Sequence, residues 1–69
     1  MSKKSTISNN IKKYRAKLGI SQDRLSKIAD VTYTTIIKIE SGATYNPRVE
    51  TLKRIADALK VSIDDIINS

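Results

Sequence analysis

The chain of 69 residues contains no cysteine and no histidine. Their absence excludes disulfide bonds, thiolate chemistry and the usual zinc ligands. Only two glycines, Gly19 and Gly42, are present, so the sequence lacks a glycine-rich loop that could cradle a phosphate. The carboxylates of Asp64 and Asp65 are adjacent in the chain and diverge on a helix, which argues against a paired catalytic site. We therefore expect no enzyme, no catalytic residue, no metal site and no cofactor.

Long apolar runs are also absent. The longest contain only a few residues, whereas a membrane-spanning helix needs about 20, and the start of the chain lacks the apolar segment of a secretory signal. We therefore expect a cytoplasmic protein that does not contact a membrane. A length of 69 residues allows one small domain, and a hydrophobic fraction of 39% is enough for one compact core.

Positive charge is in excess. Thirteen Lys and Arg residues stand against seven Asp and Glu residues, which gives a net charge of +6. Such an excess attracts polyanions, although it also serves solubility alone, so charge leaves both interpretations open. Residues 1–7 are polar and basic without periodicity. We expect a flexible arm there, either lying along phosphates or forming a solvated tail, and a single domain over residues 8–69.

The spacing of apolar residues predicts five helices and no strand. The first four are expected near residues 8–18, 22–29, 33–40 and 49–59, and a short fifth helix is expected after Ser62. Hydroxyl side chains stand at the helix starts, and Ser62 with Asp65 has the spacing of a capping box. The apolar positions that we expect to face the core are Ile11, Tyr14, Leu18, Leu25, Ile28, Ala29, Ile36, Ile39, Val49, Leu52, Ile55, Ala56 and Leu59.

Residues 21–42 organise the rest of the chain. Two short helices are joined there by Asp30-Val31-Thr32, a connection long enough only for a sharp corner, and this is the pattern of a helix-turn-helix. The second of these helices can enter a DNA major groove with its outer face. Its outward residues, which are suited to reading base edges, are Tyr33, Thr34, Ile37 and Lys38. The alternative is that Ile37 is a single surface apolar residue, which is common.

Other polar residues flank this unit. Gln22 begins a helix, where its amide and free backbone N–H groups can both meet a phosphate. The loop before residue 49 carries hydroxyl, amide and guanidinium groups suited to phosphate or groove contacts, on Thr44, Tyr45, Asn46 and Arg48. Ordinary turn chemistry is the alternative, with Asn46 as a helix cap and Pro47 in the first helical position.

The last predicted helix is more apolar than so short a helix can bury against its own domain. Its apolar residues are Ile63, Ile66 and Ile67, and we expect part of this surface to contact a second subunit.

Three segments together carry a resemblance to a known family: LGISQDRLSKIADV, TTIIKIESG and NPRVETLKRIADALKVSIDDII. Over Ile11 to Ile67 the chain resembles the lambda-repressor-like, Cro/XRE-type helix-turn-helix family of bacterial and phage regulators. The resemblance implies an all-α, compact five-helix lambda-repressor-like DNA-binding domain. It places the helix-turn-helix at helices 2 and 3, with helix 3 as the recognition helix.

The resemblance also implies roles for individual residues. Gln22 matches a phosphate-contacting position at the start of helix 2, and Arg48 matches a position that reaches the minor groove in some members. Arg15 and Glu40 match a buried structural ion pair. Positions that read bases are matched by Tyr33, Thr34 and Lys38, with Ile37 beside them, and positions that contact the DNA backbone by Ser41, Thr44, Tyr45 and Asn46.

Three residues depart from the family pattern. Asp30 stands where Gly is usual in the turn, but Asp tolerates the left-handed backbone conformation better than most residues. Lys60 stands where Gly often ends helix 4. Ile37 replaces a residue that is usually polar, which bears on the DNA sequence read and not on the fold.

The function that the resemblance implies is sequence-specific binding of double-stranded DNA by a transcriptional regulator. We expect a repressor that acts as a homodimer on a palindromic operator, without an evident small-molecule ligand. Two alternatives keep the fold and change the role. One is the antitoxin of a toxin–antitoxin pair, and the other is the controller protein of a restriction–modification system.

Overall fold

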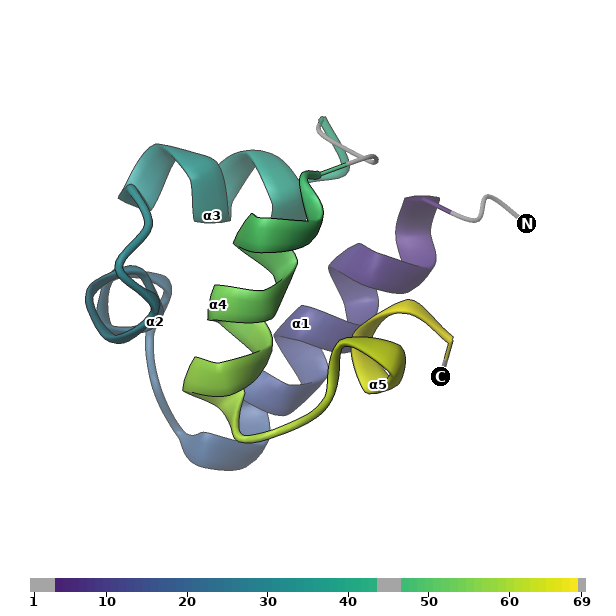
Figure 1. The fold of residues 1–69 in the computed structure, drawn as a ribbon. Coiled ribbons are helices and arrows are strands. Elements are labelled where there is room, and N and C mark those ends of the chain that lie inside the picture. Colours follow the sequence, from purple (N-terminus) through teal and green to yellow (C-terminus); the bar gives the residue numbers. More distant parts are fainter. Residues whose placement is uncertain (1–3, 44–46, 69) are drawn as a thin grey trace.

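The computed structural model describes residues 4–43 and 47–68, and these residues form five helices and no strand. The helices are α1 (Lys4–Leu18), α2 (Gln22–Ala29), α3 (Tyr33–Glu40), α4 (Val49–Leu59) and α5 (Ile63–Ile67). Figure 1 shows α3 along one outer edge of the molecule, with α4 crossing in front of α1. The predicted all-α, five-helix fold is confirmed.

Three of the connections between helices repeat one local design, at residues 19–21, 30–32 and 60–62. The first residue of each is left-handed, with φ of 68°, 60° and 63°. The second is apolar, packs against the core, and donates its N–H to a carbonyl five residues earlier. The third is Ser or Thr, and its side chain accepts the backbone N–H three residues later. Each helix end and the next helix start are therefore fixed by local hydrogen bonds, which makes each corner sharp.

The core lies between all five helices. α2 packs against α3 and α4, and α1 packs against α3 and α5. The buried hydrophobic residues are Ile11, Leu25, Ala29, Ile36, Ile39, Leu52, Ile55, Ala56, Leu59 and Ile66. Because α3 has its neighbours on one side only, its inner side is buried and its outer side is left exposed (Figure 1).

Three residues that we expected in the core are exposed, namely Leu18, Ile28 and Val49. The buried side of α2 runs through Leu25, Ser26 and Ala29, which leaves Ile28 on the opposite edge of that helix. Leu18 is the last residue of α1 and Val49 is the first residue of α4, and the core does not reach these helix ends. Val49 is 70% exposed. Apolar spacing identified the right helices but did not show how far each buried side extends.

The first helix begins earlier than predicted. α1 starts at Lys4, so residues 4–7 of the expected flexible arm are helical, and residues 1–3 lie outside the described residues. Ser8 is therefore not a helix cap. Its side chain is buried, and its hydroxyl donates to the backbone carbonyl of Glu40. Ile7 packs partly against the core, and these two tertiary contacts favour the longer helix.

α4 begins at Val49, as predicted, but the alternative interpretation of the residues before it, ordinary turn chemistry, is wrong for Pro47. Arg48 is the N-cap of α4, so Pro47 precedes the helix and does not occupy the first helical position. No side chain caps this end of α4 in the described part of the chain. The proposed capping residue Asn46 lies outside the described residues.

The fifth helix buries more than predicted. Ile66 is completely buried in the core, so it cannot form part of a subunit contact, and Ile63 is half-buried. Ile67 is exposed and stays a candidate for such a contact. The capping box between Ser62 and Asp65 is present, as predicted. Among the described residues, every helix is too short or too polar to cross a membrane.

Candidate nucleic-acid interface

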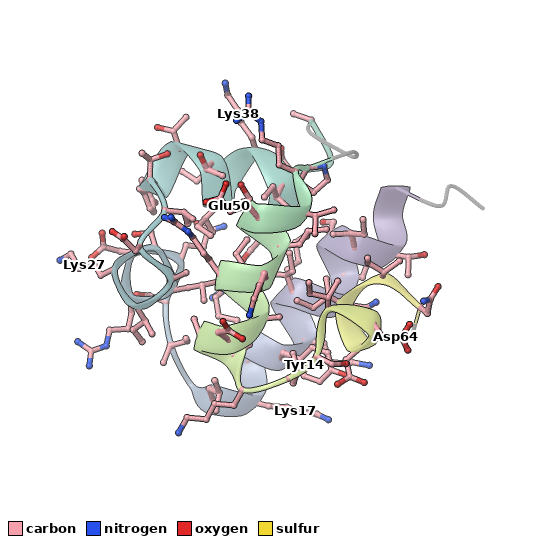
Figure 2. All side chains as sticks on the ribbon, in the orientation of Figure 1. Tyr14, Lys17, Lys27, Lys38, Glu50 and Asp64 are labelled. Atoms are coloured by element: carbon pink, nitrogen blue, oxygen red, sulfur yellow. The ribbon has the colours of Figure 1, made fainter. Side chains whose placement is uncertain are left out.

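The outer side of α3 carries the four residues predicted to read bases. Tyr33 is 47% exposed and Ile37 is 38% exposed, and Thr34 and Lys38 are also exposed. Figure 2 shows the Lys38 side chain pointing away from the body of the protein. On the inner side of the same helix, Ile36 and Ile39 are buried. The helix therefore presents hydroxyl, ammonium and aliphatic groups on one surface while its other side is fixed in the core.

The turn before α3 is held by hydrogen bonds from two directions. The Thr32 side chain accepts the Thr35 backbone N–H at 3.2 Å, and the two hydroxyl oxygens lie 2.7 Å apart. From α4, Arg54 Nη1 donates to the carbonyl of the left-handed Asp30 at 3.0 Å. The Arg54 guanidinium also lies 3.4 Å from a carboxylate oxygen of Glu50. The corner between α2 and α3 is thus fixed both locally and by α4.

The end of α3 is held by a buried polar cluster around Glu40. Arg15 donates from Nε to Oε2 at 2.9 Å and from Nη2 to Oε1 at 3.0 Å. Gln22 Nε2 donates to Oε1 at 3.0 Å, and Arg15 Nη1 donates to the carbonyl of Ile20 at 3.1 Å. The ion pair expected between Arg15 and Glu40 is therefore present, and Gln22 joins it. Within the described residues, every buried side-chain polar atom has a hydrogen-bond partner.

The remaining predicted site residues lie around the ends of α3. Ser41 is exposed, and its hydroxyl donates to the carbonyl of Lys38 at 3.0 Å and accepts the N–H of Ala43 at 3.3 Å. Arg48 is exposed at the start of α4. The predicted contact residues Thr44, Tyr45 and Asn46 lie outside the described residues.

Some cations of the described residues are paired with a carboxylate and others are not. Lys27 lies 3.3 Å from a carboxylate oxygen of Asp23, and Lys53 lies 3.5 Å from one of Asp57. Lys38 and Arg48 form no ion pair with any described residue. Their charges are consequently available to an anion.

Two residues that hold this site together were not identified from the sequence. Ser8 looked like a helix cap, yet it lies on the same side of α1 as Ile11 and Arg15, which follow it by three and seven residues. That spacing was the available signal for a polar residue facing the core. For Arg54, no sequence pattern links it to Asp30. In the described part of the chain, no group of three or more acidic residues is arranged to hold a metal ion.

Comparisons with known proteins agree with this geometry. A family model described as helix-turn-helix matches residues 11–66. An uncharacterised HTH-type transcriptional regulator of Archaeoglobus fulgidus is 38% identical over 56 residues, which cover 81% of this chain and 78% of that protein. Another from Methanocaldococcus jannaschii is 38% identical over 60 residues, covering 87% of this chain and 89% of that protein.

Two other matches show less: one covers a small part of a much longer protein, and the other is a similarity of fold at low sequence identity. A glutamine–fructose-6-phosphate aminotransferase of Methanocaldococcus jannaschii is 32% identical over 62 residues, 90% of this chain, but the chain spans only 6% of that protein's length. The crystal structure of the hypothetical transcription factor NHTF from Neisseria has a TM-score of 0.89 at 20% identity, and the match covers 96% of this chain and 75% of that one. The family match and the two regulators that are matched over most of their length together show that the chain belongs to the Cro/C1-type helix-turn-helix family and is a transcriptional regulator with a helix-turn-helix DNA-binding domain.

Proposed function

We propose that this regulator is a repressor that binds double-stranded DNA sequence-specifically, as a cytoplasmic homodimer on a palindromic operator, without enzymatic activity. One observation carries the proposal. The outer side of α3 exposes Tyr33, Thr34, Ile37 and Lys38, while the inner side is fixed by the core and by the Glu40 cluster. A helix whose outer side is exposed and whose inner side is packed in the core is suited to the major groove.

The chemistry of the exposed side chains suggests what each one reads. The Lys38 ammonium can donate to the O6 and N7 acceptors of guanine, and the aliphatic Ile37 can contact a thymine methyl group. The hydroxyls of Tyr33 and Thr34 can donate or accept. Each well-matched contact is worth about 1–3 kcal/mol of discrimination against a wrong base.

Phosphate contacts would surround this base-reading helix. The first turn of α2 leaves backbone N–H groups without helical partners, next to Gln22. Because one N–H of the Gln22 amide is already donated to Glu40, its other N–H is the one left for a phosphate. Ser41 and Arg48 lie beyond the other end of α3, and Arg48 forms no ion pair with a described residue. Such contacts supply affinity and make it depend on salt, and they do not select a sequence.

The small size of one such interface supports the proposed homodimer. A single helix-turn-helix module contacts only a short stretch of DNA, and two modules whose recognition helices lie about 34 Å apart would read two half-sites on one side of the duplex. The exposed Ile67 and the half-buried Ile63 offer apolar surface for a subunit contact. Repression would then result from occupation of a promoter.

Selection of bound sites from random duplex DNA, using the purified full chain, tests the proposal. We expect enrichment of a two-fold symmetric site with half-site centres about one helical turn apart. Recovery of unenriched random sequence would overturn sequence-specific binding. A single unsymmetrical half-site would overturn the homodimer. The selected site placed over a reporter promoter should lower expression, and raised expression would overturn repression.

A further inference from the structure

We propose that Ser8 of α1 is a positioning residue for the recognition helix, and that its hydroxyl sets how well α3 discriminates between DNA sequences. The inference rests on the proposed function of α3. Ser8 is buried, and it donates to the backbone carbonyl of Glu40, the last residue of α3 and 32 residues away in the chain.

The hydrogen bonds at the end of α3 show why this contact differs from the others. The last four carbonyls of a helix have no partner within it. Three of those of α3 are satisfied locally: Ile37 by the Ser41 N–H at 2.9 Å, Lys38 by the Ser41 hydroxyl at 3.0 Å, and Ile39 by the Gly42 N–H at 3.1 Å. The carbonyl of Glu40 receives the Ser8 hydroxyl from another helix. Local bonds can move together with α3, but the Ser8 bond ties α3 to the body of the protein.

Two anchors from α1 therefore meet the same residue of α3. Ser8 holds the Glu40 backbone, and Arg15, two helical turns further along α1, holds the Glu40 carboxylate. With the Arg15 anchor alone, the polar link between α1 and the end of α3 would run through the Glu40 side chain. The second anchor acts on the main chain itself, so it fixes the tilt of α3. Lys38 and Ile37 lie within one turn of this point, and base contacts depend on close alignment of such side chains.

A matched control lies on the same helix. Asn10 is also buried, and its Nδ2 donates to the backbone carbonyl of Ile66 at 2.6 Å. It thus makes the same kind of contact, from a side chain of α1 to the last turn of another helix. That helix is α5, which carries none of the residues proposed to read bases. Loss of the Asn10 contact should weaken the fold without moving α3.

The experiment compares Ser8→Ala and Asn10→Ala with the unmodified chain. The dissociation constants for the selected operator and for a scrambled duplex of equal length are measured at one salt concentration, at a temperature where circular dichroism shows all three proteins folded. We expect Ser8→Ala to lose about tenfold in the ratio of the two constants, because operator binding weakens while phosphate contacts persist. Asn10→Ala should keep the ratio within about twofold, even where its melting temperature is the lower of the two.

Three results would count against these ideas in different ways. A ratio unchanged in Ser8→Ala, or lost equally in Asn10→Ala, overturns the positioning role of Ser8. An unmodified chain that binds both duplexes equally overturns the proposed function itself. If Ser8→Ala does not fold, Ser8→Cys takes its place, since a thiol is close in size to the hydroxyl and donates only weakly. The same loss of ratio is expected of it, and an unchanged ratio overturns the proposal.

Discussion

The guanidinium of Arg15 and the carboxylate of Glu40 form a two-point hydrogen-bonded ion pair, with N···O distances of 2.9 and 3.0 Å. The two partners differ in solvent access. The Glu40 side chain is 2% exposed, whereas that of Arg15 is 22% exposed. Removing Arg15 therefore leaves a charge that is buried, whereas removing Glu40 leaves a charge that still has access to water. This difference leads to the first prediction.

Arg15→Met should destabilise the protein more than Glu40→Gln. The first change leaves a carboxylate buried with only the Gln22 amide beside it, and breaking a buried pair in this way costs about 3–5 kcal/mol. The second leaves a guanidinium that can still reach water and donate to the new amide oxygen, at a cost of about 1–2 kcal/mol. Urea denaturation midpoints of the two variants measure the difference. Equal losses would show that the exposure of Arg15 has no energetic consequence.

Lys38→Ala should weaken binding to the operator by about tenfold while non-specific binding falls by less than about threefold. The reason is that Lys38 projects from the base-reading side of α3 and forms no ion pair with a described residue. Lys17→Ala is the matched control, because it removes the same charge from the opposite end of the molecule (Figure 2). Titrations on both duplexes provide the measurement. Equal losses on the two duplexes would reassign Lys38 to a phosphate contact.

Local signals made most of the fold predictable. A hydroxyl residue before each of α2, α3 and α5 marked the helix start, and the same chemistry fixes these starts in the structure. Asp30 was expected to accept the left-handed conformation, and it has φ of 60°. These features depend on a few neighbouring residues, so the sequence contains the information needed to find them.

Features that depend on distant residues were not predictable in the same way. The early start of α1 depends on contacts that Ile7 and Ser8 make with the rest of the fold. The pairing of Arg15 with Glu40 was expected only from the family resemblance, because nothing in the local sequence joins residues 25 positions apart. Likewise, the exposure of Ile28 depends on which side of α2 meets α3 and α4, and apolar spacing alone is consistent with either edge.

Two substitutions at left-handed positions should change stability in opposite directions. Gly19→Ala is expected to cost about 1 kcal/mol, although an added Cβ would meet no atom within 4 Å, because φ of 68° is unfavourable for a residue with a side chain. Lys60→Gly is expected to stabilise the protein by about 0.5–1 kcal/mol, since it relieves the same strain at φ of 63°. Thermal and urea unfolding measure both effects. A destabilised Lys60→Gly would mean that the lysine side chain contributes more than its backbone strain costs.

The capping box of α5 makes stability depend on pH at acidic values. The Ser62 backbone N–H donates to a carboxylate oxygen of Asp65 at 3.0 Å, and this bond, together with the nearby Ser62 side chain, holds the pKa of the Asp65 carboxyl below its usual value of 3.8. The folded state therefore favours the carboxylate. This contribution is complete above the usual value of 3.8, which applies in the unfolded chain, and is lost as the pH falls through the lower pKa of the folded state. Asp65→Asn should accordingly be less stable than the unmodified protein at pH 7. The two should converge only as the pH falls below 3.8 and through the lower pKa of the folded state, because a protonated Asp65 resembles the amide. Urea midpoints at a series of pH values between 7 and 2 test this expectation, and a gap that stays constant over that range would exclude a titrating Asp65 as its source.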